Sequence, residues 1–104
     1  MTAIGFLSVA PVIEGSMSEE VAAAVEALEA YDVEYETTPM GTVIEAETAA
    51  AVFAAAQGAH EAVDGDRVST VLKLDDKRGV ETTADAKVAA VEEHLGRAAR
   101  SDRE

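Results

Sequence analysis

The sequence contains no cysteine among its 104 residues. This absence excludes disulfides, thiolate catalysis and cysteine-ligated metal in one step. Long hydrophobic runs are missing too. No run approaches the ~18 apolar residues that a membrane span needs, and no charged leader precedes the apolar N-terminal stretch. These absences predict a soluble cytoplasmic protein without a membrane partner.

Positively charged residues are scarce. Eight lysines and arginines face 21 aspartates and glutamates, which gives a formal net charge of −13. A surface of this sign repels phosphate backbones, so we expect no nucleic-acid partner. The acids are spread along helix faces, which argues against a disordered acidic tail. Two explanations fit this charge: a halophilic protein whose self-repulsion is screened in a salt-rich cytoplasm, and an ordinary acidic protein.

Signatures of catalysis are also missing. The sequence has no glycine-rich phosphate loop after a strand, no nucleophile elbow and no metal-ligand spacing. Asp75 and Asp76 point to opposite faces if they lie on one strand, so their spacing does not make an acid–base pair. We expect no catalytic residue, no metal and no cofactor. An enzyme that uses Glu45 or Asp76 as general base remains an alternative.

A chain of this length makes one domain, expected over residues 1–97 with a frayed tail at 98–104. The continuous apolar run at 3–11 predicts a buried central strand. Helical spacing predicts a helix of about four turns within 14–32, capped by Ser16 with Glu19 or by Ser18. Alternation predicts an edge strand at 33–39, joined by a tight connection to a strand at 41–46. The remaining predicted elements are helices at 48–63 and 82–95 and a strand at 67–76.

The predicted order is βαββαβ followed by a C-terminal helix. Since βαβ crossovers are right-handed, the economical solution is an α+β, ferredoxin-like domain: a four-stranded antiparallel sheet with two helices on one face. The first and third strands are then central. The helix residues expected to be largely buried are Val21, Val25, Leu28, Val52 or Phe53, Val88 and Val91.

The segment PMGTVIEAE, residues 39–47, places Glu45 on a central strand, where solvation at an edge cannot explain a carboxylate. Strand alternation directs Glu45 away from the helices, together with Phe6, Val43 and Lys73. A sheet face that mixes apolar and charged side chains suits a subunit interface or a ligand pocket at its rim. A solvated face with scattered apolar residues is the simpler alternative.

Several segments resemble the small thiamine-binding proteins of archaea and bacteria, which are single-domain relatives of a tandem hydroxymethylpyrimidine/thiamine-binding protein. The specific blocks are MGTVIEAE and DRV…LDDKR; the segments AP, SMSEEVAAAVEAL, AHEAV and KVAAVEEHL extend the likeness over nearly the whole chain. The sequence departs from the family in the spacing of Pro11 and Gly15, and in Lys77, where members tend to have a second arginine. We expect both departures to fall in loops, where they affect ligand details more than the fold.

The resemblance implies a ferredoxin-like fold, a dimer or tetramer, and thiamine or its pyrimidine part as ligand. Glu45 would accept from the amino group or offset the thiazolium cation, Tyr35 or Phe6 would lie against a ring, and Thr42 would add a hydrogen bond. The full set of candidate ligand-binding residues is Glu45, Thr42, Gly41, Met40, Tyr35, Phe6, Ser8 and Asp76.

Three questions stay open at this point. The ligand is thiamine, a phosphate ester of it or the free pyrimidine, and the protein carries, stores or senses it. The rival interpretation is a purely structural or regulatory oligomeric domain without a small-molecule ligand. In that case Glu45 pairs with Lys73 or with an arginine across a subunit interface.

Overall fold

The computed structural model describes residues 2–79 and 81–101. In chain order the elements are β1 (Thr2–Pro11), α1 (Ser18–Ala27), the 3₁₀ turn η1 (Leu28–Ala30), β2 (Glu34–Thr38), β3 (Gly41–Ala46), α2 (Ala49–Glu61), β4 (Val68–Lys77) and α3 (Ala84–Leu95). This order confirms the predicted α+β succession, including the additional C-terminal helix.

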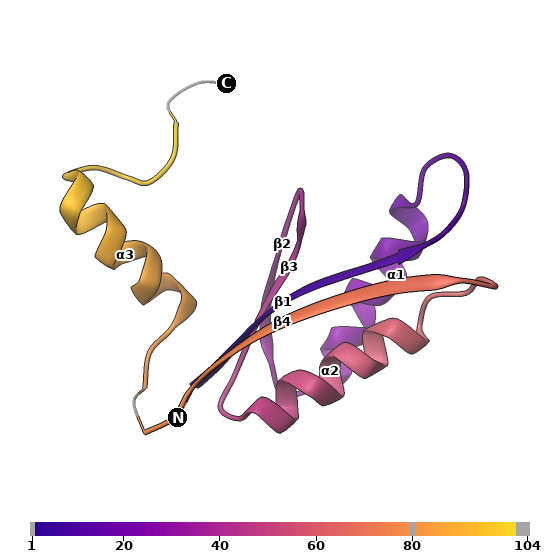
Figure 1. Ribbon diagram of the computed structural model, residues 1–104, viewed down its shortest axis with the longest axis horizontal. Coiled ribbons are helices and arrows are strands. Elements are labelled where there is room, and N and C mark those ends of the chain that lie inside the picture. Colours follow the sequence, from indigo (N-terminus) through magenta and orange to yellow (C-terminus); the bar gives the residue numbers. More distant parts are fainter. Residues whose placement is uncertain (1, 80, 102–104) are drawn as a thin grey trace.

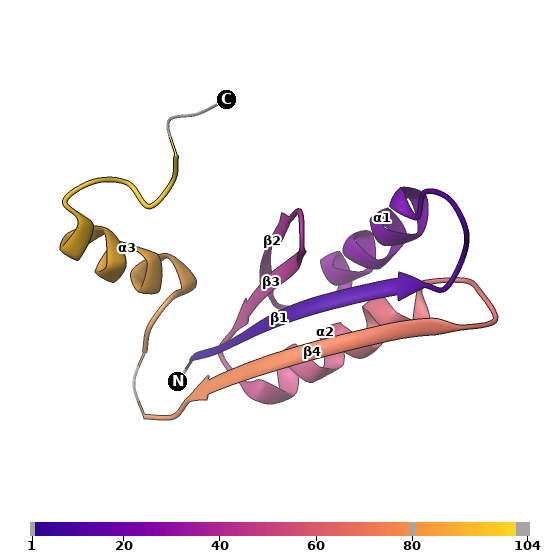
Figure 2. The same cartoon turned by 45° about the horizontal axis from the view of Figure 1, so that its top comes forward.

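The four strands form one antiparallel sheet in the order β2-β3-β1-β4. The two strands predicted to be central, β1 and β3, are central, and β2 lies at an edge as expected. Figures 1 and 2 show α1 and α2 on one face of the sheet and α3 on the other side. The arrangement is ferredoxin-like with an added helix. We call the sheet surface turned away from α1 and α2 the open face.

The core lies between the sheet and the two packed helices. Alternate β1 side chains, including Ala3 and Leu7, point into it and are buried, as is Ile44 of β3. Their cross-strand partners fix which side chains share the open face: Phe6 pairs with Val43 and Lys73. The face assignment made from alternation is therefore confirmed.

Two of the core predictions for α3 are wrong. Val88 is 50% and Val91 54% exposed, and no residue of α3 is buried. Helical spacing identifies an apolar stripe but not the surface that covers it, and α3 lies on the side of the sheet that the core does not occupy. In α2 the choice between two neighbours resolves to Val52, which is fully buried, whereas Phe53 is 55% exposed.

The start of α1 also departs from the prediction. Met17 is its N-cap residue and makes no side-chain cap, so neither the Ser16–Glu19 capping box nor a Ser18 cap forms. The Ser16 hydroxyl instead accepts from the backbone N–H of Ser18 at 3.3 Å. Leu28 is buried as predicted, but Val21 and Val25 are only half-buried. Both valines line a cavity, which accounts for their residual exposure.

The other two helices begin with threonine caps. Thr48 accepts from the N–H of Ala51 and Thr83 from that of Ala86, each satisfying a first-turn donor. Gly96, at φ 73°, ends α3 in the left-handed conformation. Residues 97–101 contain no helix or strand, and the rest of the predicted tail, 102–104, lies outside the described residues.

Gly5 lets α2 approach the middle of the sheet. A Cβ atom placed on it would lie 2.8 Å from Cγ1 of the fully buried Val52. Gly5→Ala should therefore lower the free energy of unfolding by about 1–3 kcal/mol through overpacking. In a Val52→Ala background the closest contact is gone and only Cδ1 of Leu72, at 3.2 Å, stays tight, so the same change should cost less. Urea unfolding of the four proteins measures this coupling, and an equal cost in both backgrounds would contradict it.

Candidate ligand-binding site

The turn between β2 and β3 is shaped by Pro39 and Thr38. Thr38 pairs with Gly41 across a two-residue connection made of Pro39 and Met40. No described non-glycine residue has positive φ, and proline suits the first central position of a type I turn. The Thr38 hydroxyl donates to the carbonyl of Gly41 at 2.8 Å and accepts from the N–H of Met40 at 3.2 Å. These bonds hold the hairpin tip in place without a glycine-rich loop.

A cavity of about 430 Å³ lies between this hairpin, β1 and α1. Its lining residues are Leu7, Ser8, Val9, Ala10, Met17, Val21, Ala24, Val25, Leu28, Thr37, Thr38, Pro39, Met40, Gly41 and Thr42. Apolar side chains dominate the walls. We call this cavity the hairpin pocket.

The polar side chains that line the hairpin pocket are Ser8, Thr37, Thr38 and Thr42, and two of their hydroxyl groups form a pair. Thr37 and Thr42 face each other across β2 and β3, with their Oγ1 atoms 3.1 Å apart. Thr42 is only 5% exposed. One hydroxyl hydrogen is used between the two oxygens, which leaves the pair one further donor hydrogen and several acceptor lone pairs. An apolar cavity with a few fixed polar groups is typical of small-molecule sites.

Gly41 stands where two strands come close. A Cβ atom on Gly41 would lie 2.7 Å from Cζ of Phe6 and 2.8 Å from the carbonyl oxygen of Leu7. The Phe6 ring therefore lies against the glycine, next to the end of the hairpin pocket. A larger residue at Gly41 would displace either this ring or the β1 backbone.

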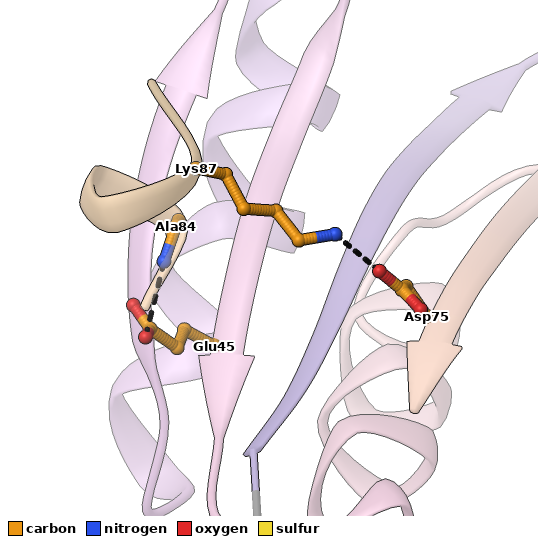
Figure 3. Close-up of polar contacts among 4 residues, drawn as sticks. All are labelled: Glu45, Asp75, Ala84 and Lys87. Atoms are coloured by element: carbon orange, nitrogen blue, oxygen red, sulfur yellow. Dashed lines mark hydrogen bonds and ion pairs between the residues drawn. The ribbon is translucent and has the colours of Figure 1, made fainter. Parts of the chain in front are cut away.

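Glu45 has a partner within its own chain that sequence reasoning did not identify. Its carboxylate accepts from the backbone N–H of Ala84, the first residue of α3, at 3.2 Å. The free N–H groups of a helix start carry partial positive charge, which favours a carboxylate there. Ile4 of β1 lies between Glu45 of β3 and Asp75 of β4 in the sheet register. Asp75 forms an ion pair with Lys87 of α3. Figure 3 shows both contacts.

We call these four residues, Glu45, Asp75, Ala84 and Lys87, the α3 clasp. It attaches the first turn of α3 to the open face, at the end of the sheet remote from the hairpin tip. Lys87 donates to Asp75 and lowers the pKa of that carboxyl, with smaller contributions from Lys77 and Lys73. The clasp consists entirely of polar contacts.

Two further cavities flank Glu45. One of about 420 Å³ is lined by Glu34, Tyr35, Glu36, Val43, Glu45, Ala84 and Asp85. The other, of about 330 Å³, is lined by Thr2, Asp32, Val33, Glu34, Glu45, Ala46, Glu47 and Glu81. Both are rich in carboxylates. Even so, no group of three or more metal-ligating side chains is placed to hold a metal ion within residues 2–79 and 81–101.

The structure does not bring all predicted site residues together. Four of the eight line the hairpin pocket: Ser8, Met40, Gly41 and Thr42. Glu45 and Tyr35 line the larger acidic cavity, near the opposite end of the sheet. The Tyr35 hydroxyl donates to Glu29 at 2.5 Å, and this bond raises the pKa of Tyr35.

The last two predicted residues line none of these cavities. Phe6 lies on the open face against Gly41. Asp76, opposite Ala3 on the helix side, accepts from Arg78 through Oδ2, while its Oδ1 is buried without a hydrogen-bond partner among the described residues.

Sequence reasoning missed two contributors to these sites. Thr37 was treated only as part of an alternating edge strand, although a two-residue connection after Thr38 pairs it directly with Thr42. Lys87 lies on a helix for which the sequence offered no docking surface. Thr37 could have been found from the length of the turn. The contact of Lys87 depends on where α3 lies relative to the sheet, which no local pattern gives.

The fold and the hairpin pocket together define a small α+β domain equipped to bind a small molecule. The model of the family described as thiamine-binding protein matches residues 6–92, and the chain belongs to that family. The resemblance seen in the sequence is thereby confirmed.

Individual relatives agree with this membership. A UPF0045 protein of Methanothermobacter thermautotrophicus is 46% identical over 83 residues, covering 77% of this chain and 84% of the relative. A UPF0045 protein of Bacillus subtilis is 39% identical over 87 residues, with 77% and 83% covered. The crystal structure of a hypothetical protein from Methanocaldococcus jannaschii superposes with a TM-score of 0.81 at 35% identity, covering 88% of this chain and 97% of that one.

Family membership indicates a small-molecule-binding protein rather than an enzyme. None of the helices in the described part of the chain has the length and apolar character needed to cross a membrane.

The lowered pKa of Asp75 gives a direct test of the α3 clasp. A carboxyl with a lowered pKa stabilises the folded contact above its ordinary pKa, and this contribution is lost as the pH falls through the lowered value. In Lys87→Met the pKa of Asp75 should rise towards its ordinary value, whereas Lys77→Met should move it less. Carbon NMR of the Asp75 carboxyl measures both. An unchanged pKa in Lys87→Met would show that α3 is not held there.

Proposed function

We propose that this protein binds thiamine or its aminopyrimidine part in the hairpin pocket and acts without catalysis. The observation that carries the proposal is an apolar cavity of about 430 Å³ with a hydroxyl pair made by the buried Thr42 and the exposed Thr37, in a chain of the thiamine-binding family. Ligand pockets typically measure roughly 300–1,000 Å³ and hold a few fixed polar groups among apolar walls.

The chemistry of the pocket suits a flat aminopyrimidine. Such a ring presents an amino donor beside a ring-nitrogen acceptor on one edge. The Thr37–Thr42 pair keeps one donor hydrogen and free acceptor lone pairs, so it can satisfy both groups on that edge. Met17 and Met40 line the same pocket and supply flexible, polarisable contacts for an aromatic ring.

The net charge bears on which form of the ligand is taken. A formal charge of −13 attracts the cationic thiazolium and repels phosphate groups. This favours thiamine or the free pyrimidine over a phosphate ester. Acidic residues also surround the cavity at Glu45, which is the alternative location for the cationic end of thiamine.

The protein is further proposed to work as a homo-oligomer, a dimer at least. The open face carries Phe6 and Val43, both half-buried, and Val71, which is 60% exposed. Apolar side chains of this size on one sheet face favour a subunit interface over water. Ser8 lines the hairpin pocket from a strand position on the open face, so a subunit packed there would lie next to the ligand.

Substitutions at Thr42 and Glu45 distinguish the two candidate ligand sites, which are the hairpin pocket and the acidic cavity at Glu45. In Thr42→Val the shape is kept and a neutral hydrogen bond is lost, so thiamine affinity should fall roughly three- to tenfold. Thr42→Ser should restore it. Glu45→Gln should leave affinity within about twofold of wild type, because the hairpin pocket does not include Glu45. Calorimetric titration with thiamine and with the free pyrimidine measures all three variants.

The contrary results are equally clear. A ten- to hundredfold loss in Glu45→Gln with unchanged affinity in Thr42→Val would move the site to the acidic cavity, since a bond to a charged group contributes about 1.5–3 kcal/mol. Binding at a hundred times the dissociation constant stabilises a protein by ~2.7 kcal/mol. No melting shift with either compound would leave the structural, ligand-free alternative.

Self-association should depend on salt. Acidic subunits repel one another, and the repulsion is screened as ionic strength rises. Light scattering at high salt should give at least twice the 10.8 kDa chain mass, and the mass should fall as salt is removed. A mass of one chain at high salt would reject the oligomer.

A further inference from the structure

Sulfur occurs in this chain only in methionine, and it is concentrated at the hairpin pocket. The sequence has three methionines and no cysteine. Met17 and Met40 line the hairpin pocket, and Met1 lies outside the described residues. We propose that Met17 and Met40 are oxidation sites, and that conversion of their thioethers to sulfoxides by hydrogen peroxide lowers the affinity of the pocket for its ligand. This inference rests on the proposed function and gives the same pocket a chemical control.

Both methionine side chains are accessible from solvent. Met40 is 80% exposed, more than any other large apolar residue in the described part of the chain, and Met17 is 37% exposed. Exposed methionine is a common target of oxidation. Hydrogen peroxide carries no charge, so a protein charge of −13 does not repel it as it repels anionic oxidants. Met40, the more exposed of the two, should react first.

The backbone around the pocket is held without either thioether. The Thr38 hydroxyl accepts from the backbone N–H groups of Met40 and Gly41 at 3.2 and 3.3 Å, which fixes the hairpin turn. Met17 contributes to the start of α1 through its carbonyl, which accepts from the N–H of Val21 at 2.9 Å. Its side chain makes no cap bond. Oxidation of the two side chains therefore changes the pocket walls and leaves these backbone contacts in place.

The chemical step is the transfer of one oxygen atom with two electrons. A sulfur lone pair attacks one peroxide oxygen, the S–O bond forms as the O–O bond breaks, and the other oxygen leaves as water with both protons. The thioether is oxidised to a sulfoxide and the peroxide is reduced to water. Methionine sulfoxide reductases, one for each sulfoxide epimer, return the thioether, so the change is reversible.

A sulfoxide weakens the contact with an aromatic ligand. The thioether is a soft, polarisable surface for a ring, whereas the sulfoxide is polar and binds water. If the sulfoxide stays against the ligand, its oxygen loses that water; if it turns outward, the ligand loses one wall of the pocket. Met17 belongs to the start of α1 and Met40 to the hairpin tip, so two walls change. Ligand affinity falls in either arrangement.

Calorimetric titration with thiamine before and after peroxide treatment tests the inference. In the wild-type protein, with the sulfoxides located by peptide mass spectrometry, affinity should fall about tenfold or more. Methionine sulfoxide reductases should restore it. The double variant Met17→Leu/Met40→Leu has no sulfur in the pocket walls, so its own affinity should be the same before and after peroxide. That variant keeps Met1, so it also detects damage outside the pocket.

A matched control separates the position of the sulfoxide from its chemistry. Phe53, 55% exposed on α2, is not among the residues that line the hairpin pocket. Phe53→Met in the double-leucine background returns one exposed thioether to the chain outside the pocket. Peroxide should oxidise this methionine and leave thiamine affinity unchanged. The urea midpoint of oxidised wild-type protein should stay close to that of untreated protein.

Three results would overturn the inference alone. They are an unchanged affinity in oxidised wild-type protein, an equal loss of affinity in the double-leucine variant, and a loss that a fall of the urea midpoint accompanies. In each case the titration of untreated protein still tests thiamine binding, so the two proposals fail separately. Absence of binding to untreated wild-type protein would overturn both.

Discussion

The architecture depends on one constraint: a four-stranded sheet has two faces, and in the described part of the chain only α1 and α2 bury side chains against it, both on the same face. Side chains alternate along β1, so Leu7 enters the core while its neighbour Phe6 faces the other way. The central strand β1 is largely apolar on both faces, although α1 and α2 cover only one of them. The uncovered open face and the exposed apolar side chains of α3, Val88, Val91 and Leu95, both follow from this imbalance.

The hairpin pocket lies on the side of the sheet that the helices cover. The helix α1 does not close fully over the tip of the β2–β3 hairpin, and a cavity of about 430 Å³ remains between them. Val21 and Val25 remain half-buried along the gap, and the buried hydroxyl of Thr42 lies within it. A cavity with so few polar groups gains specificity from where they sit, because an unmatched ligand atom there would lose its hydrogen bonds to water.

Sequence patterns predicted the layers well and the side-chain partners poorly. The apolar run of β1 and the proline-marked hairpin predicted the strand order, because period-two alternation and turn chemistry are local properties. The burial of Val88 and Val91 was wrongly expected because spacing shows a stripe but not its covering surface. Glu45 was correctly placed on a central strand facing away from the helices. Its contact with Ala84 was not foreseen, because it joins a strand to a backbone N–H far along the chain.

The pairing of β1 with β4 has a consequence for synthesis on the ribosome. Thr2 lies opposite Lys77, so the edge of β1 that pairs with β4 stays unpaired until β4 has been synthesised. Contacts between residues this far apart in sequence are slow to form, because the intervening loop must close first. Until β4 emerges, the nascent chain has an open apolar strand edge and no basic residue before Arg67. Mutual repulsion between such unfinished chains would then hinder their aggregation through that edge.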